Sequence, residues 1–451
     1  MNNKLMLYLH IPFCVRKCNY CDFVSFAGKD ACFESYVQAI CNEICAYGKF
    51  FGDREISSVY FGGGTPSILP AELLVRIMET IRNNFSLEKT KEKKENARVF
   101  LDRFRIKKAD KQSKPLDLTE VSVECNPGTV DKQKLRAYKK AGVNRLSFGL
   151  QSADPEELKT IGRIHTFDDF TDALEFARET GFQNLNVDLM QAVPGQSIES
   201  WRKTLFLTAL WKPEHISAYS LIVEEGTPFF EQQKKGLLNL PDEDTERRIY
   251  YYTKEFLEKS GYYRYEISNY AVPGYECRHN AGYWRRKEYL GLGLNASSMT
   301  DEVRRKNTAD LKTYLSAFEN LERALKIVSE ACEQFAQKEP AAAIMNPVSE
   351  QDGSAGGSKA VQATESKVIE EIHRLSRKEQ MEEYMFLGLR MAEGIQKQDF
   401  FDTFGQDFDF TYGDVVYDLK TKELLEETDG RLFLTERGVD VSNQVFSEFL
   451  L

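Results

Sequence analysis

The stretch His10-Ile-Pro-Phe-Cys14-Val-Arg-Lys-Cys18-Asn-Tyr-Cys21-Asp-Phe23 carries three thiols on an expected loop, directly after the apolar run Leu5–Leu9. Thiols at CxxxCxxC spacing can face one point, and thiolates are the ligands that zinc and iron–sulfur clusters select. A structural zinc needs a fourth ligand, which His10 could supply. A cubane cluster held by three cysteines instead leaves one iron open for a small molecule. The spacing alone therefore predicts a metal centre of one of these two kinds.

The composition limits the classes of protein to which this chain can belong. With 451 residues, 42% of them hydrophobic, it is long enough for several domains and a large core. A formal net charge of -10 offers no general attraction to phosphate backbones, so we expect no nucleic-acid binding. We find neither a signal-peptide core nor a membrane-spanning run, which favours a cytoplasmic protein. The nine cysteines then indicate metal or redox chemistry rather than disulfides.

Short β-rich runs alternate with helical stretches from residue 4 to about residue 225, which predicts parallel βαβ units. The expected strands are Leu5–Leu9, Ser57–Phe61, Leu118–Cys125, Val143–Leu150, Leu185–Leu189 and His215–Ser220. The expected helices are Phe33–Tyr47, Ala71–Asn84, Asp131–Ala141, Phe167–Thr180 and Ile198–Leu210. We therefore predict an α/β fold, an incomplete (β/α)6 TIM-like barrel that works at the carboxyl edge of its strands.

Two stretches interrupt this pattern. Residues 87–114 contain eleven Lys and Arg and five acidic residues, which favours either a solvated surface insertion or a contact for anionic lipid or an acidic partner. Residues 331–375 include a run that is poor in large apolar side chains, so we expect a flexible linker there. Residues 1–225 are thus the expected partial barrel, and residues 226–330 the region that completes it.

The last expected domain covers residues 376–451. Helices are predicted at Glu379–Ala392 and Val415–Leu425, followed by a hairpin at Gly430–Thr435 and a final helix through Val445. Helices on a short ribbon resemble a winged-helix module. Because this one is not notably basic, we expect it to pack or to dock a partner rather than to bind DNA.

Polar residues and glycines follow several of the expected strands. The run Gly62-Gly63-Gly64-Thr65-Pro66 comes after the second strand, where consecutive glycines let a ligand approach bare backbone. Later strands end in, or are followed by, single polar residues. A structural salt bridge explains any one of them. These residues are Glu124, Gln151, Arg163 and Asp188.

Taken with the cysteine loop, these motifs resemble the radical S-adenosylmethionine (SAM) family, in its coproporphyrinogen-dehydrogenase-like branch, from about residue 4 to residue 300. The resemblance implies a [4Fe–4S] cluster held by Cys14, Cys18 and Cys21, whose open iron chelates the amino and carboxylate groups of SAM. It also implies a set of residues that contact SAM. Gly63, Gly64 and Thr65 would contact its amino group, Glu124 and Asp188 the ribose or sulfonium end, Gln151 the ribose and Arg163 the carboxylate. Tyr8 would pack beside the ligand, although it suits a core position equally well.

Within this branch the chain resembles two kinds of protein. The first is the oxygen-independent coproporphyrinogen III dehydrogenase of porphyrin biosynthesis, which has a further cysteine where this chain has Phe23. The second is the group of heme chaperones, whose Cys-Asn-Tyr-Cys-Asp-Phe signature is matched by residues 18–23. This second resemblance implies a protein that binds heme and passes it to an acceptor protein. A flavodoxin- or ferredoxin-type electron donor is also implied, and a peripheral membrane contact is an open alternative.

The heme chaperones also share an HNxxYW motif, which here is His279-Asn-Ala-Gly-Tyr-Trp284. The resemblance makes His279 the candidate heme ligand, and a neutral imidazole is a good axial ligand for heme iron. The alternative is that His279 only holds the following turn by hydrogen bonds. The sequence departs from the family where Asn295 and Ser297 replace a glycine and a histidine. Cys277 is expected to be a buried thiol, since no CxxCH spacing supports covalent heme attachment. We expect the same of the five other cysteines outside the loop, which are Cys32, Cys41, Cys45, Cys125 and Cys332.

Overall fold

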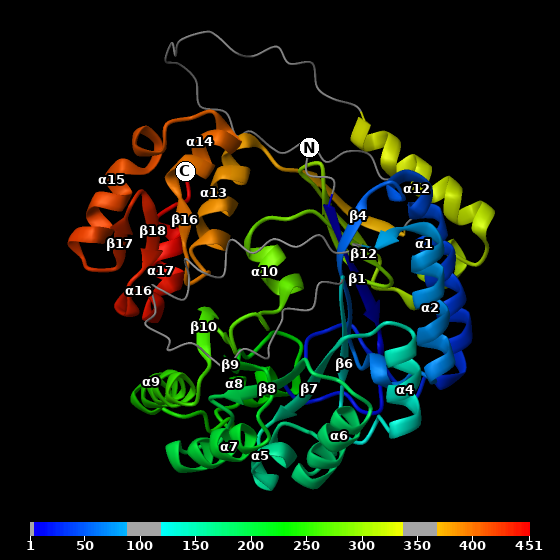
Figure 1. Ribbon diagram of the computed structural model, residues 1–451, viewed down its shortest axis with the longest axis horizontal. Coiled ribbons are helices and arrows are strands. Elements are labelled where there is room, and N and C mark those ends of the chain that lie inside the picture. The colour runs from blue at the N-terminus through cyan, green and yellow to red at the C-terminus, as the bar shows by residue number, and fades with distance from the viewer. Residues whose placement is uncertain (1–3, 88–118, 337–367) are drawn as a thin grey trace.

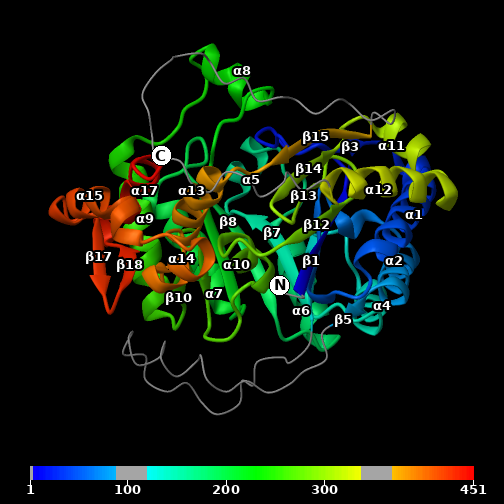
Figure 2. The same ribbon diagram turned by 90° about the horizontal axis from the view of Figure 1, so that it is seen from above.

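The fold is built on a parallel sheet in which the strand of each βα unit pairs with the strand of the next unit (Figures 1 and 2). A computed structural model describes residues 4–87, 119–336 and 368–451. Its central strands are β1 (Lys4–Ile11), β4 (Glu55–Gly63), β6 (Glu120–Cys125), β7 (Arg145–Gln151), β8 (Leu185–Gln191) and β9 (His215–Ser220). Each pairs in parallel with its neighbour in this order. The predicted incomplete barrel is confirmed.

Further strands extend both edges of this sheet. Beyond β9 lie β11 (Asn269–Ala271) and β10 (Tyr263–Glu266), which are antiparallel. Beyond β1 lie β12 (Tyr289–Leu292), parallel to β1, and then antiparallel β13 (Ser297–Thr300), β14 (Val303–Asn307) and β15 (Ile369–Arg374). In the part of the chain that the structure describes, β10 and β15 are the two edge strands of this sheet. The barrel is therefore open between them.

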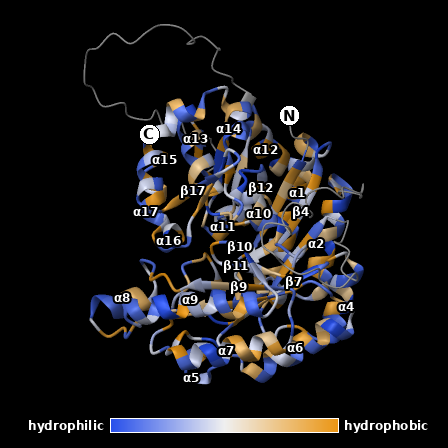
Figure 3. Cartoon of the chain, turned by 60° about the vertical axis from the view of Figure 1, so that its left-hand side comes forward, coloured by the Kyte–Doolittle hydropathy of each residue, from blue (hydrophilic) through white to orange (hydrophobic). Residues whose placement is uncertain are grey.

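Helices cover the outer side of the sheet (Figure 1). They include α1 (Phe33–Phe51), α2 (Ala71–Asn84), α4 (Lys132–Lys140), α6 (Phe167–Glu179), α7 (Ile198–Leu210) and α9 (Glu243–Lys259). Capping boxes at Thr166 and Ser197 start α6 and α7. Figure 3 shows hydrophobic residues along the strands and hydrophilic residues on the exposed side of α4.

The pleat of each strand separates two environments. Along β7, Leu146, Phe148 and Leu150 belong to the main hydrophobic core. The alternate residues, among them Ser147 and Gln151, point to the other side of the sheet because side chains alternate along a strand. The inner side of the barrel is thus polar, as a site for a polar ligand requires.

Residues 376–451 form a C-terminal module with its own hydrophobic core. It contains α13 (Arg377–Gly388), α14 (Lys397–Phe404), α15 (Phe408–Thr421), α16 (Glu436–Asp440), α17 (Ser442–Ser447) and the antiparallel strands β16 (Ile395–Gln396), β17 (Leu425–Thr428) and β18 (Arg431–Leu434). The helix predicted at Val415–Leu425 begins earlier, because Asp407 caps it by accepting a hydrogen bond from the Phe410 amide.

The C-terminal module lies across the opening of the barrel. Met391 forms an isolated antiparallel bridge with Glu266 at the end of β10, and the Ala392 amide donates to the Tyr265 carbonyl at 2.9 Å. At the other edge, β15 ends at Arg374, shortly before α13 begins. Non-covalent contacts of the module therefore bridge the two free edges of the sheet.

The linker predicted over residues 331–375 is wrong at both ends. Its first residues belong to α12 (Leu321–Ala336), whose apolar positions Ala324, Ile327, Val328 and Ala331 are buried. Near its end, β15 pairs with β14. Its sequence, Ile-Glu-Glu-Ile-His-Arg, lacks the strict alternation of apolar and polar residues that indicates a strand. The middle of the predicted linker, and residues 88–114 of the basic stretch, lie outside the described residues.

In the described ranges, every helix is too short or too polar to cross a membrane. The described cysteines are all free thiols. Cys277, Cys41 and Cys125 are buried, whereas Cys32, Cys45 and Cys332 are only partly so. The expectation of a buried thiol at Cys277 is met.

A buried carboxyl group ties α1 to the strands beyond β1. Glu43 is fully buried and accepts hydrogen bonds from the Tyr314 hydroxyl at 2.6 Å, the Gly293 amide at 2.8 Å and the Asn307 side chain at 2.8 Å. Burial raises the pKa of Glu43 to about 7. The folded protein therefore holds this proton over a range where the unfolded chain releases it.

This linkage predicts a pH-dependent stability. The stabilisation from the raised pKa is complete below about pH 4.5 and is lost as pH rises through about 7. Relative to Glu43→Gln, the wild-type free energy of unfolding should fall by about 3 kcal/mol over this range, measured by urea titration at several pH values. Glu34→Gln, an exposed change on the same helix, should follow the wild-type curve. Parallel curves for wild type and Glu43→Gln would contradict the assignment.

Candidate cofactor site at the barrel mouth

The cysteine loop is fastened to the barrel at several points. Cys14 ends the short strand β2 (Phe13–Cys14), which pairs with β3 (Phe26–Ala27). Between the other two thiols, the Asn19 amide donates to the Ile161 carbonyl at 3.0 Å, and its side chain donates to the Thr160 carbonyl at 2.9 Å. The loop therefore rests on the end of α5 (Pro155–Thr160).

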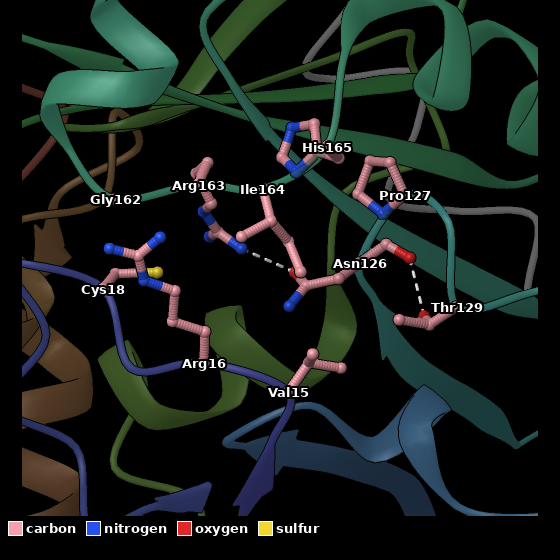
Figure 4. A pocket seen from close by; sticks show the side chains of 10 residues that line it. All are labelled: Val15, Arg16, Cys18, Asn126, Pro127, Thr129, Gly162, Arg163, Ile164 and His165. Carbon is pink, nitrogen blue, oxygen red and sulfur yellow. Dashed lines mark hydrogen bonds between the residues drawn. The ribbon is translucent and has the colours of Figure 1, made fainter.

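A chain of hydrogen bonds joins the loop to the strand ends. Arg163 donates to the Asn126 side-chain oxygen at 2.8 Å, and the Asn126 amide group donates to Thr65 Oγ1 at 2.8 Å. Thr65 Oγ1 then approaches Cys14 Sγ at 3.5 Å. Arg163 also donates to the Tyr20 hydroxyl at 3.0 Å. Figure 4 shows Arg163 directed toward Asn126, in a depression that Cys18 also lines.

In the protein alone, the surroundings of Cys21 favour its neutral thiol form. Burial raises the pKa of the Cys21 thiol to about 11, and the thiols of Cys18 and Cys14 add to the rise. A thiolate ligand at Cys21 therefore needs nearby positive charge, which the irons of a bound cluster would supply. Among the residues that the structure describes, no group of three His, Cys, Asp or Glu side chains is arranged around a single metal ion.

His10 does not provide the fourth ligand of a zinc site. Its Nε2 pairs with the Val24 carbonyl at 2.8 Å and its Nδ1 with the Tyr8 hydroxyl at 3.1 Å. Burial also lowers the pKa of His10, so the ring is neutral. Both ring nitrogens are thus engaged, and the ring instead fixes the far end of the cysteine loop. The three-thiol donor set fits a cubane cluster with one open iron.

The glycine run allows β4 to approach the cysteine loop closely. Gly63 has a φ of 108°, and a Cβ there would lie 2.5 Å from the His10 ring. The Gly64 amide donates to the Ile11 carbonyl at 2.9 Å. This amide is therefore used within the protein, which the sequence did not predict.

Two predicted carboxylates face each other across the inner side of the barrel. Burial raises the pKa of Glu124 to about 7, with a further rise from Asp188. Glu124 accepts a hydrogen bond from the Tyr60 hydroxyl at 2.9 Å. Asp188 accepts from Ser147 Oγ at 2.9 Å and from the Asn186 side chain at 2.7 Å. Neither carboxylate is in a salt bridge among the described residues, so both remain suited to a ligand.

Gln151 stands at an irregularity of the sheet. The pairing register between β7 and β8 shifts between Gly149 and Gln151, and Gln151 has a φ of 69°. A left-handed conformation is costly for a residue with a side chain, so Gln151 is a locally strained position. The Tyr219 hydroxyl donates to Gln151 Oε1 at 2.7 Å, which holds the side chain at the mouth of the barrel.

The structure does not offer His279 as a heme ligand. The residue is 1% exposed, its Nδ1 pairs with Ser58 Oγ at 2.8 Å and its Nε2 with the Tyr283 hydroxyl at 3.0 Å. Burial lowers the pKa of His279 to about 3, so the imidazole is neutral. It lies near the start of α10 (Arg278–Trp284) and stacks on Tyr60. Its geometry agrees with a positioning role.

A cavity of about 390 Å³ adjoins Tyr8 and His10. Aromatic rings and Met299 form much of its wall, together with Asn295 and Ser297, the two departures noted in the sequence. Its lining comes from β1, the cysteine loop, α10, the β12–β14 strands and α13 of the C-terminal module. The remaining lining residues are Phe23, Tyr283, Trp284, Arg286, Tyr289, Arg304 and Leu387.

Several residues of this region were missed in the sequence. Asn126 directly follows the Glu124-Cys125 pair, so its place after a strand could have indicated it. Tyr20 lies inside the cysteine signature and could have been found in the same way. Arg286 and Arg304 line the same cavity as Leu387 of the C-terminal module. Only the tertiary fold brings these residues together, so no local pattern indicates them.

Replacing any one of the three cysteines tests this site. We expect Cys14→Ser, Cys18→Ser and Cys21→Ser each to lose most bound iron and sulfide after anaerobic reconstitution, because a cluster needs all three thiolates. Cys32→Ser, a nearby thiol outside the loop, should keep the wild-type iron content and absorbance. Full iron in a triad variant would rule out this ligand set.

Comparison with known proteins agrees with this geometry. A model of the radical SAM superfamily matches residues 8–208, and a model of the HemN C-terminal domain matches residues 375–441. The heme chaperone HemW of Lactococcus lactis is 32% identical over 444 residues, 98% of this chain and 97% of its own. HemW of Bacillus subtilis is 31% identical over 443 residues, 98% of each chain.

A solved structure shows the same fold. Coproporphyrinogen III oxidase (HemN) from Escherichia coli, a radical SAM enzyme, superposes with a TM-score of 0.73 at 21% identity, covering 99% of this chain and 90% of that one. Because the similarity to the curated relatives extends over nearly their whole length, the chain belongs to the HemW family of the radical SAM superfamily.

Proposed function

We propose that this protein is a heme chaperone, which binds heme and transfers it to an acceptor protein. Membership of the radical SAM superfamily implies a [4Fe–4S] cluster and SAM. The similarity to proteins named heme chaperone HemW supports heme as the cargo. We place the protein in the cytoplasm, with a flavodoxin- or ferredoxin-type electron donor. The predicted membrane contact through the basic stretch concerns residues outside the described ranges.

Cys14, Cys18 and Cys21 hold the cluster in this proposal. When bound, the cluster would supply one-electron chemistry and an open iron that chelates SAM. The residues of the barrel mouth orient SAM: Arg163 pairs with its carboxylate, and Gln151, Glu124 and Asp188 face its ribose and sulfonium end. Tyr8 and the backbone of Gly63, Gly64 and Thr65 complete the site.

The observation that carries the heme proposal is the cavity beside Tyr8. A porphyrin presents two broad apolar faces, and the aromatic rings and Met299 of this cavity offer matching apolar surface. The HNxxYW motif contributes Tyr283 and Trp284 to the wall, while His279 lies behind Tyr283 and holds its hydroxyl. We therefore assign the motif a wall-building role rather than axial ligation by His279.

A hemin titration of the anaerobically purified full-length chain tests this proposal. We expect a saturable Soret shift, and a Trp284→Ala variant that binds at least about tenfold more weakly because it loses a large apolar contact. Phe410→Ala, at a ring that is 93% exposed on α15, should bind like wild type. His279→Ala should leave the Soret position of bound heme unchanged.

The competing function is oxidative decarboxylation of coproporphyrinogen III. Its support is the common fold with HemN. Phe23 counts against it, because that enzyme group has a cysteine at this position. Formation of protoporphyrinogen IX by reconstituted protein with SAM and a reductant would favour the enzyme. Absence of a saturable Soret shift in the hemin titration would contradict the heme-chaperone function.

A further inference from the structure

Two guanidinium groups line the cavity, and one carboxylate of the C-terminal module pairs with both. Arg286 Nε lies 3.2 Å from Glu383 Oε2, and Arg304 Nη2 lies 2.8 Å from Glu383 Oε1. A second bond from Arg304 Nε reaches the same Oε1 at 3.1 Å. Glu383 is 7% exposed, so this is a largely buried carboxylate between two cations.

The three residues come from separate parts of the fold. Arg286 follows α10 with a φ of 50°, Arg304 lies on β14, and Glu383 lies on α13 one turn before the cavity residue Leu387. Helix α13 thus places Leu387 in the cavity wall and the Glu383 carboxylate against the two arginines of that wall. Arg286 is further paired with Glu302, whereas Arg304 contacts the Tyr289 hydroxyl.

We propose that Arg286 and Arg304 recognise the carboxylates of a flat, apolar dicarboxylate ligand, and that Glu383 occupies their binding position until the ligand arrives. This inference rests on the proposed function, since heme carries two propionates on an apolar macrocycle. Arginine is well suited to the role because its planar fork binds carboxylates through two parallel hydrogen bonds.

The exposure of the lining sets the orientation of the ligand. The Arg304 side chain is 39% exposed, whereas the Arg286 side chain is 8% exposed and His10 is 3% exposed. Carboxylates are costly to bury and apolar edges are not. A ligand carboxylate on Arg304 therefore stays close to solvent, and the apolar part of the ligand lies against the buried part of the lining.

Ligand binding is then coupled to the position of α13. A buried Glu383 that lost both arginines would be an unpaired charge, which is strongly destabilising. It must instead turn to water, and α13 must loosen from the barrel. The module also contacts the barrel away from α13: Glu393 pairs with Arg285 at 2.8 Å, Arg390 lies over the Trp284 ring at 4.3 Å, and Met391 forms the bridge to the end of β10.

Comparing hemin with its dimethyl ester tests the recognition of carboxylates. We expect the wild type to bind hemin at least about tenfold more tightly than the ester, and Arg304→Gln to lose this preference. Glu383→Gln, which removes the internal competitor, should bind hemin more tightly and the ester as before. Glu393→Gln is the matched control, because it removes a module carboxylate that lies outside the cavity lining.

Equal binding of hemin and ester by the wild type, or weaker hemin binding by Glu383→Gln, would overturn the inference while leaving heme binding intact. Binding of neither compound would instead overturn the proposed function. A second measurement needs no variant: amide hydrogen exchange in α13 should increase when hemin binds the wild-type chain. Increased protection there would contradict the displacement of Glu383.

Discussion

The candidate site depends on a loop that carries three free thiols and is held in place by hydrogen bonds to the barrel. Burial and mutual repulsion disfavour the charged thiolates, as the raised pKa of Cys21 shows. The protein counters this with fixed geometry. Asn19 fastens the loop to the end of α5, His10 fastens its far end, and the line from Arg163 through Asn126 and Thr65 reaches Cys14. The same hydrogen bonds that position the thiols therefore connect the cluster loop with the residues assigned to SAM.

The barrel interior follows from the alternation of its strands. Outward residues are apolar and join the helices in one core, and inward residues are polar and bond to one another, as Ser147, Asn186 and Asp188 do. An interior of this kind is unusual for a closed TIM barrel, which is packed with branched apolar side chains. It leaves carboxylates such as Glu124 within reach of a ligand at the mouth.

Much of the fold was predictable because it depends on local patterns. Runs such as Leu185–Leu189 and helices such as Ala71–Asn84 lie where periodicity placed them, and the cysteine spacing indicated the site. Charged edge strand β15 was not predictable, since its pairing with β14 comes from distant chain segments. His279 shows the same limit: its motif was found, but the partners Ser58 and Tyr283 that engage both ring nitrogens are set by tertiary packing. The cavity, which combines β1, β14 and α13, lay beyond any local pattern.

The bridge between the free edges of the sheet has a consequence for how the molecule is assembled in the cell. Met391 and Ala392, which meet the β10 end, are translated after the cysteine loop and all the central strands. Domains generally fold in the order in which they leave the ribosome. The contact that closes the gap at β10 therefore forms last, after the cysteine loop and the central strands have already left the ribosome.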